Sequence, residues 1–220
     1  MVRGKSQTRP KNGNDAKTGR SATKRAAAQR TPSTSDRHPL FRAYLAVSLD
    51  GYIADSRGSV DWLNPYFSPE IDFGAFMRSI GAIVVGRATY DWAAAHGGAT
   101  AHFGGRTIVM THRPILNVPA GVEAYSGDVR PLVERLKREL AGRDKDVWLM
   151  GGGKSLAAFH EAGLVDRWEL GIMPALLGDG IPLFPPGAGA VEPLRLVHQR
   201  VLKSGMIEAW YEPQRGTARL

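Results

Sequence analysis

The 220-residue chain contains no cysteine. Disulfides, thiolate zinc sites and a cysteine nucleophile are therefore excluded, and redox chemistry would need a bound cofactor. Any metal would be left to His and carboxylate ligands, and we predict no metal site. The sequence also lacks an apolar run long enough to span a bilayer and the apolar stretch of a secretory signal. We therefore expect a cytoplasmic protein with no membrane segment.

Residues 1–38 have almost no large apolar side chains. They contain ten Lys or Arg against Asp15 and Asp36, so the net charge of +8 belongs to this segment and the rest of the chain is balanced. Such a composition cannot offset the entropy of ordering, and we predict a disordered basic tail. Three interpretations stay open for it: a solvated extension, a loose electrostatic contact with nucleic acid or an anionic surface, and a transit peptide.

The rest of the chain has the length and apolar content of one folded domain. With 43% hydrophobic residues overall, it can bury one core and is too short for two ordinary domains. We place this domain at residues 39–213 and predict a flexible C-terminus at 214–220.

Short apolar runs alternate with segments of helical periodicity in this domain. Runs without polar alternation, such as Ala82–Val85, are typical of strands covered on both faces of a parallel sheet. The predicted strands are 41–47, 52–54, 82–85, 107–110, 122–125 and 147–150, and the predicted helices are 70–79, 87–95, 130–140 and 154–161. For the first helix, Ser68 and Pro69 fit the N-cap and the first helical position.

The last part of the domain changes character. Residues 167–173, 194–202 and 206–211 have strand patterns with no helix between them. The sequence therefore predicts an α/β fold with a mostly parallel central sheet and an antiparallel C-terminal hairpin at its edge.

Glycine occupies two predicted strand-to-helix junctions. Gly86 precedes the helix 87–95, and Gly151–Gly153 precede the helix 154–161. Glycine lets backbone amides approach a ligand closely, and the N–H groups and positive dipole end of a helix favour phosphate. One such junction alone is as consistent with a tight loop as with a ligand site, but two on adjacent strands indicate a dinucleotide site. Neither has the G-x-G-x-x-G pattern, so a Rossmann fold is not supported.

Five motifs in order resemble those of the dihydrofolate reductase superfamily, which includes the reductase domain of riboflavin biosynthesis and small bacterial homologues. They are Ala46–Ala54, Ser59–Leu63, Gly86–Tyr90, Gly151–Gly153 and Pro174–Phe184. The resemblance implies a three-layer dihydrofolate-reductase-like fold, NADPH as cofactor and a homodimer. It also implies a cis peptide between Gly151 and Gly152. Trp210 and Tyr211 could supply interface surface or belong to the core.

The resemblance assigns the cofactor contacts. The loop Thr111–Arg113, together with Arg87, would receive the adenosine 2′-phosphate through charge-assisted bonds, although both arginines could be ordinary surface residues. The implied cofactor-binding residues are Ala46, Ile53, Gly86, Arg87, Thr89, Thr111, Arg113, Met150, Gly151, Gly152, Gly153, Lys154 and Ser155.

The substrate side needs a proton source as well as a hydride acceptor, which favours a carboxylic acid or a water that it orients. By resemblance, Asp50 at the exit of the first strand ranks first, and Glu70 and Asp72 near the first helix follow. The alternatives are a turn-forming role for Asp50 and dipole-stabilising roles for the other two. Asp50, Trp62 and Phe73 are the predicted substrate contacts, with core packing as the alternative for Trp62.

The sequence therefore predicts an NADPH-dependent reductase acting on a pterin-like or a ribosylated aminopyrimidine substrate. The segment Gly86–Asp91 is closer to dihydrofolate reductases, whereas Asp50-Gly51 follows the riboflavin reductases, so the substrate stays open. A fused deaminase is excluded because its zinc signature needs cysteine. The alternatives are a non-catalytic dinucleotide-binding protein and a nucleic-acid-associated protein that acts through its basic tail.

Overall fold

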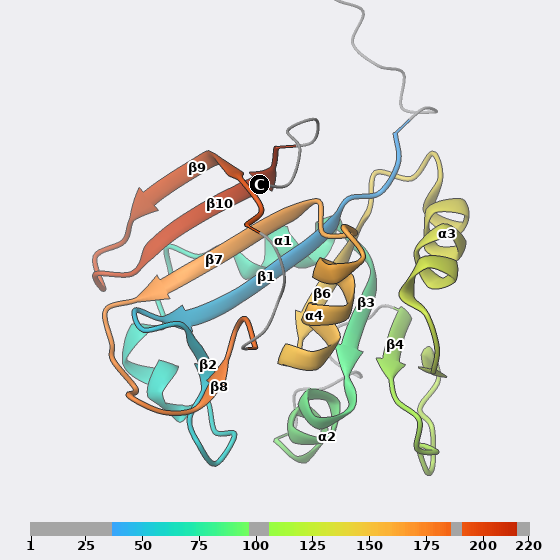
Figure 1. Ribbon diagram of the computed structural model, residues 1–220, viewed down its shortest axis with the longest axis horizontal. Helices are drawn as coiled ribbons and strands as arrows, with labels where there is room; N and C mark the ends of the chain where they lie inside the picture. Colours follow the sequence, from blue (N-terminus) through green and yellow to red (C-terminus); the bar gives the residue numbers. More distant parts are fainter. Residues whose placement is uncertain (1–36, 97–105, 186–190, 215–220) are drawn as a thin grey trace, which may run out of the picture. The chain divides into compact units, whose positions relative to one another are not determined.

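A computed structural model describes residues 37–96, 106–185 and 191–214 (Figure 1). The strands of its main sheet are β1 (Phe41–Ser48), β3 (Ile80–Gly86), β4 (Arg106–Met110), β5 (Val122–Tyr125), β6 (Asp146–Gly151), β7 (Arg167–Met173), β9 (Leu194–Val201) and β10 (Ile207–Pro213). Their order is β5-β4-β3-β6-β1-β7-β10-β9. Pairing is parallel from β5 to β7, and β10 is antiparallel to both of its neighbours. This confirms the predicted fold class.

Helices cover both faces of the sheet. They are α1 (Phe73–Ser79), α2 (Arg87–Ala95), α3 (Val129–Leu140) and α4 (Gly153–Glu161). Leu132 of α3 and Phe159 of α4 belong to the largest apolar cluster, on one face, while Phe76 of α1 packs with Ile83 and Trp148 on the other. Figure 1 shows α4 in front of the sheet and α1 behind it. The chain therefore forms three layers.

The first helix begins later than the sequence predicts. The expected start at Glu70, with Ser68 as N-cap, is wrong: α1 starts at Phe73, and the Asp72 carboxylate accepts a hydrogen bond of 2.7 Å from the Ala75 amide. Aspartate is a strong N-cap, and it captures the first turn ahead of the Ser68-Pro69 pair. All other predicted elements are present, with ends within two residues of those expected.

Two further elements lie beside the main sheet. The short strands β2 (Tyr52–Ala54) and β8 (Ile181–Pro182) pair antiparallel. The segment predicted as a loop after β2 contains a 3-10 helix, η2 (Asp61–Tyr66). The strand β2 follows the carboxyl end of β1, and β8 follows the carboxyl end of β7. Both β1 and β7 are central strands of the main sheet.

The predicted tail and C-terminus fall mostly at residues 1–36 and 215–220, outside the described residues. Arg37, at the end of the predicted tail, donates a hydrogen bond of 3.0 Å to the Asp146 carboxylate. Across the described ranges, no helix has both the length and the apolar character needed to cross a bilayer.

A buried ion pair joins the central strands. Arg42 of β1 donates two hydrogen bonds, of 2.6 and 2.8 Å, to the Glu169 carboxylate of β7, and a third of 3.2 Å to Asp146 of β6. The Glu169 side chain has no exposed surface. The Arg42 guanidinium also lies 4.9 Å from the centroid of the Phe76 ring. The pair therefore fixes three adjacent strands and supports the aromatic side chains above them.

We expect Arg42→Met to lower the free energy of unfolding by roughly 3–5 kcal/mol, because the buried Glu169 carboxylate loses both of its hydrogen bonds to Arg42 and keeps only Arg167, whose Nη1 lies 3.7 Å from its Oε1. Urea denaturation at neutral pH measures the loss. The double variant R42M/E169M removes both charges and should recover most of it. An R42M protein as stable as the parent would contradict this account.

Candidate functional site

A cavity of about 1490 Å³ lies at the carboxyl ends of the parallel strands. Ala46 of β1, Met110 of β4, Met150 of β6 and Met173 of β7 are among the residues that line it. This edge is where open α/β sheets bind ligands. Because pockets for drug-sized ligands span about 300–1,000 Å³, the cavity has room for a dinucleotide beside a second small molecule.

The two glycine junctions meet in this cavity. A Cβ atom on Gly152 would lie 3.4 Å from the Gly86 Cα and 3.3 Å from the Thr89 Oγ1, and one on Gly86 would lie 3.3 Å from the Gly151 carbonyl oxygen. Gly151 and Gly152 also have φ angles of 127° and 84°. The two segments therefore approach so closely that side chains on Gly86 and Gly152 would crowd the space between them. The cis geometry of the Gly151-Gly152 peptide stays a prediction.

The helices that start at these junctions differ from the other two α-helices. Asp72 caps α1 and Asp128 caps α3, whereas α2 and α4 start after Gly86 and Gly152 without a capping side chain. The first turns of both uncapped helices line the cavity. Their free N–H groups and positive dipole ends make this part of the cavity suited to an anion.

The backbone amide of Ser155, one of the implied cofactor-binding residues, has a partner within the protein. The Ser155 amide donates a hydrogen bond of 2.9 Å to the Gly152 carbonyl, so it is not free for a ligand, because it already closes the first turn of α4. Ser155 itself still lines the cavity, as do Gly153 and Lys154.

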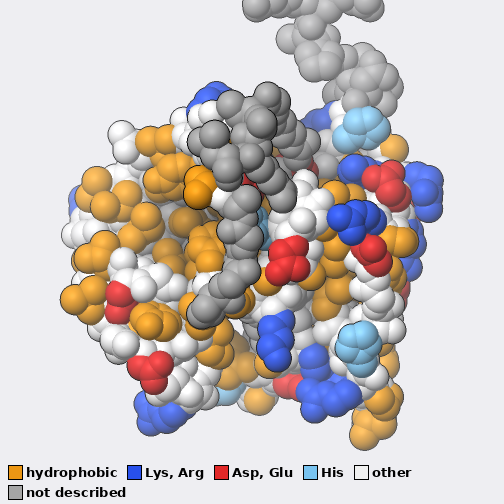
Figure 2. All heavy atoms as spheres, viewed as in Figure 1, with side chains coloured by type: hydrophobic (Ala, Val, Ile, Leu, Met, Phe, Trp, Pro, Cys, Tyr) orange, Lys and Arg blue, Asp and Glu red, His pale blue; other side chains and the backbone are white. Residues whose placement is uncertain are grey.

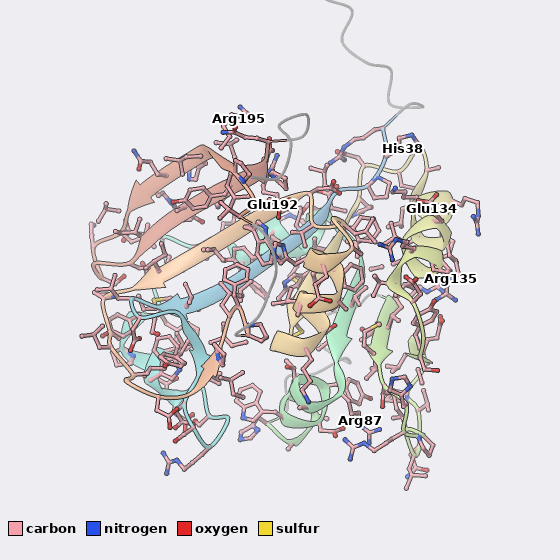
Figure 3. All side chains as sticks on the ribbon, viewed as in Figure 1. His38, Arg87, Glu134, Arg135, Glu192 and Arg195 are labelled. Atoms are coloured by element: carbon pink, nitrogen blue, oxygen red, sulfur yellow. The ribbon has the colours of Figure 1, made fainter. Side chains whose placement is uncertain are left out.

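Positive side chains border the same end of the cavity. Arg87 at the start of α2 (Figure 3) donates to the Asp91 carboxylate at 2.7 Å and to the Pro114 carbonyl at 3.0 Å, which fixes it against the loop after β4. In that loop Thr111 and His112 line the cavity, whereas Arg113 is exposed and does not. The structure thus brings the predicted loop to the cavity through Thr111, which the sequence singled out, and His112, which it did not.

Aromatic rings form another part of the cavity wall. Tyr44, Phe73 and Trp148 line it, and the Tyr44 ring stacks on Phe76 with centroids 4.2 Å apart. Burial raises the pKa of the Tyr44 hydroxyl to about 12, and the nearby carboxylates of Glu208 and Glu169 add to the shift. The hydroxyl is therefore protonated at neutral pH and can donate a hydrogen bond.

Asp50, ranked first for catalysis, holds a loop. Its carboxylate accepts hydrogen bonds from the Ser48 hydroxyl at 2.6 Å and from the amides of Gly178 at 2.7 Å and Leu177 at 3.0 Å. These bonds, led by that of Ser48, lower the pKa of Asp50. A carboxylate with a lowered pKa is ionised at neutral pH and is a poor proton donor.

The other predicted carboxylates do not line the cavity either, although their neighbours Ile71 and Phe73 do. Among the described residues that line it, Asp50, Glu70 and Asp72 are absent. Glu70 accepts from the Lys203 amide at 3.0 Å, which lowers its pKa and ties its loop to the β9–β10 hairpin. Trp62 packs against the apolar cluster of Met173, Leu202 and Met206.

Sequence reasoning missed Glu208. It is the one carboxylate among the described residues that line the cavity, and it is only 8% exposed. The sequence feature that could have indicated a role for Glu208 is its position as a lone acidic residue in the apolar run Met206–Tyr211. That run was assigned to the sheet edge, away from the glycine junctions.

The three-layer fold and the cavity at its strand ends define the dihydrofolate-reductase-like class. Within that class, the chain belongs to the RibD C-terminal domain family, whose family model matches residues 39–207. This is a family of reductase type.

Two relatives come from Bacillus subtilis (strain 168), and both are named as uncharacterized proteins. The chain is 28% identical to YyaP over 185 residues, which cover 76% of this chain and 91% of that protein. It is 32% identical to YwjB over 143 residues, which cover 64% of this chain and 80% of that protein.

Solved structures agree with this assignment. A candidate riboflavin biosynthesis protein from Shewanella sp. PV-4 is 26% identical, with a TM-score of 0.69 over 80% of this chain and 99% of that one. Dihydrofolate reductase from Enterococcus faecalis, complexed with NADP(H), shares the fold at 18% identity, with a TM-score of 0.53 over 80% of this chain and 96% of that one. A deaminase/reductase from Thermotoga maritima shares it at 21% identity and a TM-score of 0.55, over 80% of this chain and 57% of that one.

We expect Asp50→Asn to lower the melting temperature at neutral pH, because the neutral amide offers one acceptor oxygen instead of two and no charge to the bonds that hold the 177–178 loop. The folded-state pKa of Asp50 lies below its ordinary value of 3.8, so the stabilisation of the fold by this carboxylate is fully present above pH 3.8. The stabilisation is lost as the pH falls through the lowered folded-state pKa. Melting curves of both proteins between neutral pH and about pH 3 test this. The difference should shrink only in acid, and a pH-independent difference would contradict the role assigned to the charge.

Proposed function

We propose that the protein is an NADPH-dependent reductase that transfers a hydride to a pterin-like or ribosylated aminopyrimidine substrate. The observation that carries this proposal is the pair of uncapped helices, α2 and α4, that start at touching glycine junctions on one cavity. Two helix N-termini directed at one site fit the two phosphates of a dinucleotide. The family assignment and the NADP(H) complex of the Enterococcus enzyme support it.

The cavity residues fit such a cofactor. A Cβ atom on Gly86 or Gly152 would crowd the narrow space between the junctions, which is the cradle that a pyrophosphate requires. Gly151–Lys154 and Gly86–Thr89 would hold the pyrophosphate, and Ala46, Ile53 and Met150 would contact the nicotinamide half. Arg87, with the loop of Thr111–Arg113, would bind the 2′-phosphate that distinguishes NADPH from NADH.

When bound, the cofactor supplies a hydride, with its two electrons, to an electron-poor carbon such as that of a C=N bond. The acceptor nitrogen takes one proton, so the C=N bond becomes CH–NH. Tyr44, Phe73 and Trp148, which line the cavity, would pack against a flat substrate and exclude water from it. We assign delivery of this proton to the Tyr44 hydroxyl or the Glu208 carboxylate, because both line the cavity.

A non-catalytic dinucleotide-binding protein is the second candidate. The observation that favours it is that Asp50, Glu70 and Asp72 all lie outside the described cavity lining. Proton delivery by one of these three acids, as first expected from the sequence, therefore lacks support in the geometry.

A homodimer remains part of the proposal. Trp210 is not at an edge, because β10 lies between β7 and β9. The edge strand beside β10 is β9, which exposes Leu194, Leu196 and Val201. Figure 2 shows apolar side chains gathered over this part of the viewed face. An exposed apolar edge strand is a surface on which two copies can pair.

We expect NADPH to raise the melting temperature more than NADH does. Arg87→Gln should narrow this difference by lowering the NADPH effect alone, since the 2′-phosphate loses a charged partner. Arg195→Gln is the matched control, because Arg195 forms a surface pair with Glu212 at 2.9 Å and does not line the cavity. Equal shifts from the two cofactors in the parent protein would refute the 2′-phosphate assignment.

The same protein then separates the two candidates. Loss of the reduced-nicotinamide absorbance is followed with dihydrofolate and with the ribosylated aminopyrimidine of riboflavin synthesis as substrates. A reductase oxidises NADPH with one of them. Tight NADPH binding without turnover on either substrate would favour the non-catalytic candidate instead.

A further inference from the structure

The segment 174–183, which follows β7, is attached to the turn between β1 and β2. At one end, the Leu183 amide donates a hydrogen bond of 2.9 Å to the Gly51 carbonyl. In the middle, the Asp50 carboxylate accepts from two amides of the segment, at 2.7 and 3.0 Å. Asp50 therefore joins the end of β1 to a part of the chain that lies 127 and 128 residues later.

The Asp50 carboxylate is itself oriented by β1. The Ser48 hydroxyl donates to the Asp50 Oδ1 at 2.6 Å and accepts from the Tyr52 amide at 2.9 Å. Ser48 is only 1% exposed, so this hydroxyl lies inside the turn. The Asp50 Oδ2 is the oxygen that accepts from the Gly178 amide. The carboxylate thus connects a buried hydroxyl of β1 to the backbone of the segment 174–183.

Gly180 fixes the path of the segment beside β2. A Cβ atom on Gly180 would overlap the Ala54 carbonyl oxygen, so the two backbones approach too closely for any side chain there. The next residue, Ile181, is paired with Ala54 in the antiparallel ladder of β2 and β8. The Asp50 contact and this ladder together hold β8 in one place against β2.

The strand β8 in turn contacts the start of α4. A Cβ atom on Gly153, the first residue of α4, would lie 3.1 Å from the Pro182 carbonyl oxygen and 3.9 Å from the Ile181 Cγ2. All three residues line the cavity, and Gly153 is buried. Figure 1 shows β8 between β2 and α4. The β8 backbone therefore supports the first turn of the helix whose N–H groups are proposed to bind the pyrophosphate.

We propose that Asp50 is a positioning residue for the cofactor, because the segment that it holds supports the first turn of α4. This inference rests on the proposed function and adds to it a residue that does not line the cavity. Since α4 begins without a capping side chain, the contact with β8 replaces one of the usual restraints on a helix start. Releasing the Asp50 carboxylate should let β8 and this first turn shift, so that the amides proposed to bind the pyrophosphate lose their alignment.

Titration of NADPH into the full chain, at a temperature at which each variant is folded, tests this inference. We expect Asp50→Asn to weaken NADPH binding about tenfold, because displaced amides make poorer hydrogen bonds to a pyrophosphate. Asp166→Asn is the matched control. The Asp166 carboxylate also accepts from a distant backbone amide, that of Phe41 at 2.8 Å, but it precedes β7 at the opposite end of the sheet and does not line the cavity. The D166N protein should therefore bind NADPH as tightly as the parent.

Amide hydrogen exchange of the same proteins without cofactor measures the support of α4 directly. The D50N substitution should speed exchange at residues 153–157 several-fold, whereas D166N should leave it unchanged, since a general loss of stability would affect both proteins alike. A folded D50N protein with the parent's NADPH affinity, or with the parent's exchange rates at 153–157, would overturn the inference.

Should D50N fail to fold, Gly180→Ala decides instead, because the added methyl group displaces the segment from Ala54 while Asp50 is kept. A several-fold loss of NADPH affinity is expected, and an unchanged affinity in a folded G180A protein would overturn the inference. A parent chain that binds no NADPH, beside faster exchange at 153–157 in D50N, would support the role of Asp50 in holding α4 and contradict the cofactor proposal alone.

Discussion

The close contact between two glycine junctions is the constraint on which the site depends. Gly86 ends β3 and Gly152 follows β6, which are adjacent strands, and a side chain on either glycine would press against the other segment. Because both helices then begin without a capping side chain, their N-termini are left for a ligand to satisfy. The contact thus determines where the cavity lies and which charge it favours at this end.

The other end of the cavity depends on the buried pair of Arg42 and Glu169. This pair joins β1 to β7 and supports Phe76, on which the Tyr44 ring stacks. A buried pair of this kind adds little net stability but strongly penalises arrangements that separate it. It therefore holds the aromatic wall in register with the strands that carry Ala46 and Glu208.

The sequence was sufficient for the fold and for the position of the two glycine junctions. Uninterrupted apolar strands and glycines at the helix starts are local signals, and they predicted the sheet and the meeting of the two junctions correctly in outline. The roles of the acidic residues were harder to predict, because Asp50 and Glu70 accept hydrogen bonds from segments that are distant in the sequence. Local sequence patterns do not encode such long-range contacts. Asp50 binds the amides of Leu177 and Gly178, more than a hundred residues away. Glu208 reaches the cavity only because β10 inserts beside β7, a pairing that no local pattern specifies.

The central claim is that the glycine contact forms a dinucleotide cradle, and a titration of NADPH against Gly86→Ala tests it most directly. Gly74→Ala is the matched control, since Gly74 lies within α1 and does not line the described cavity. With melting used to verify folding, the account predicts that the G86A substitution weakens NADPH binding by about tenfold or more, equivalent to at least 1.4 kcal/mol, while G74A leaves it unchanged. A folded G86A protein that binds NADPH as tightly as the parent would contradict the account.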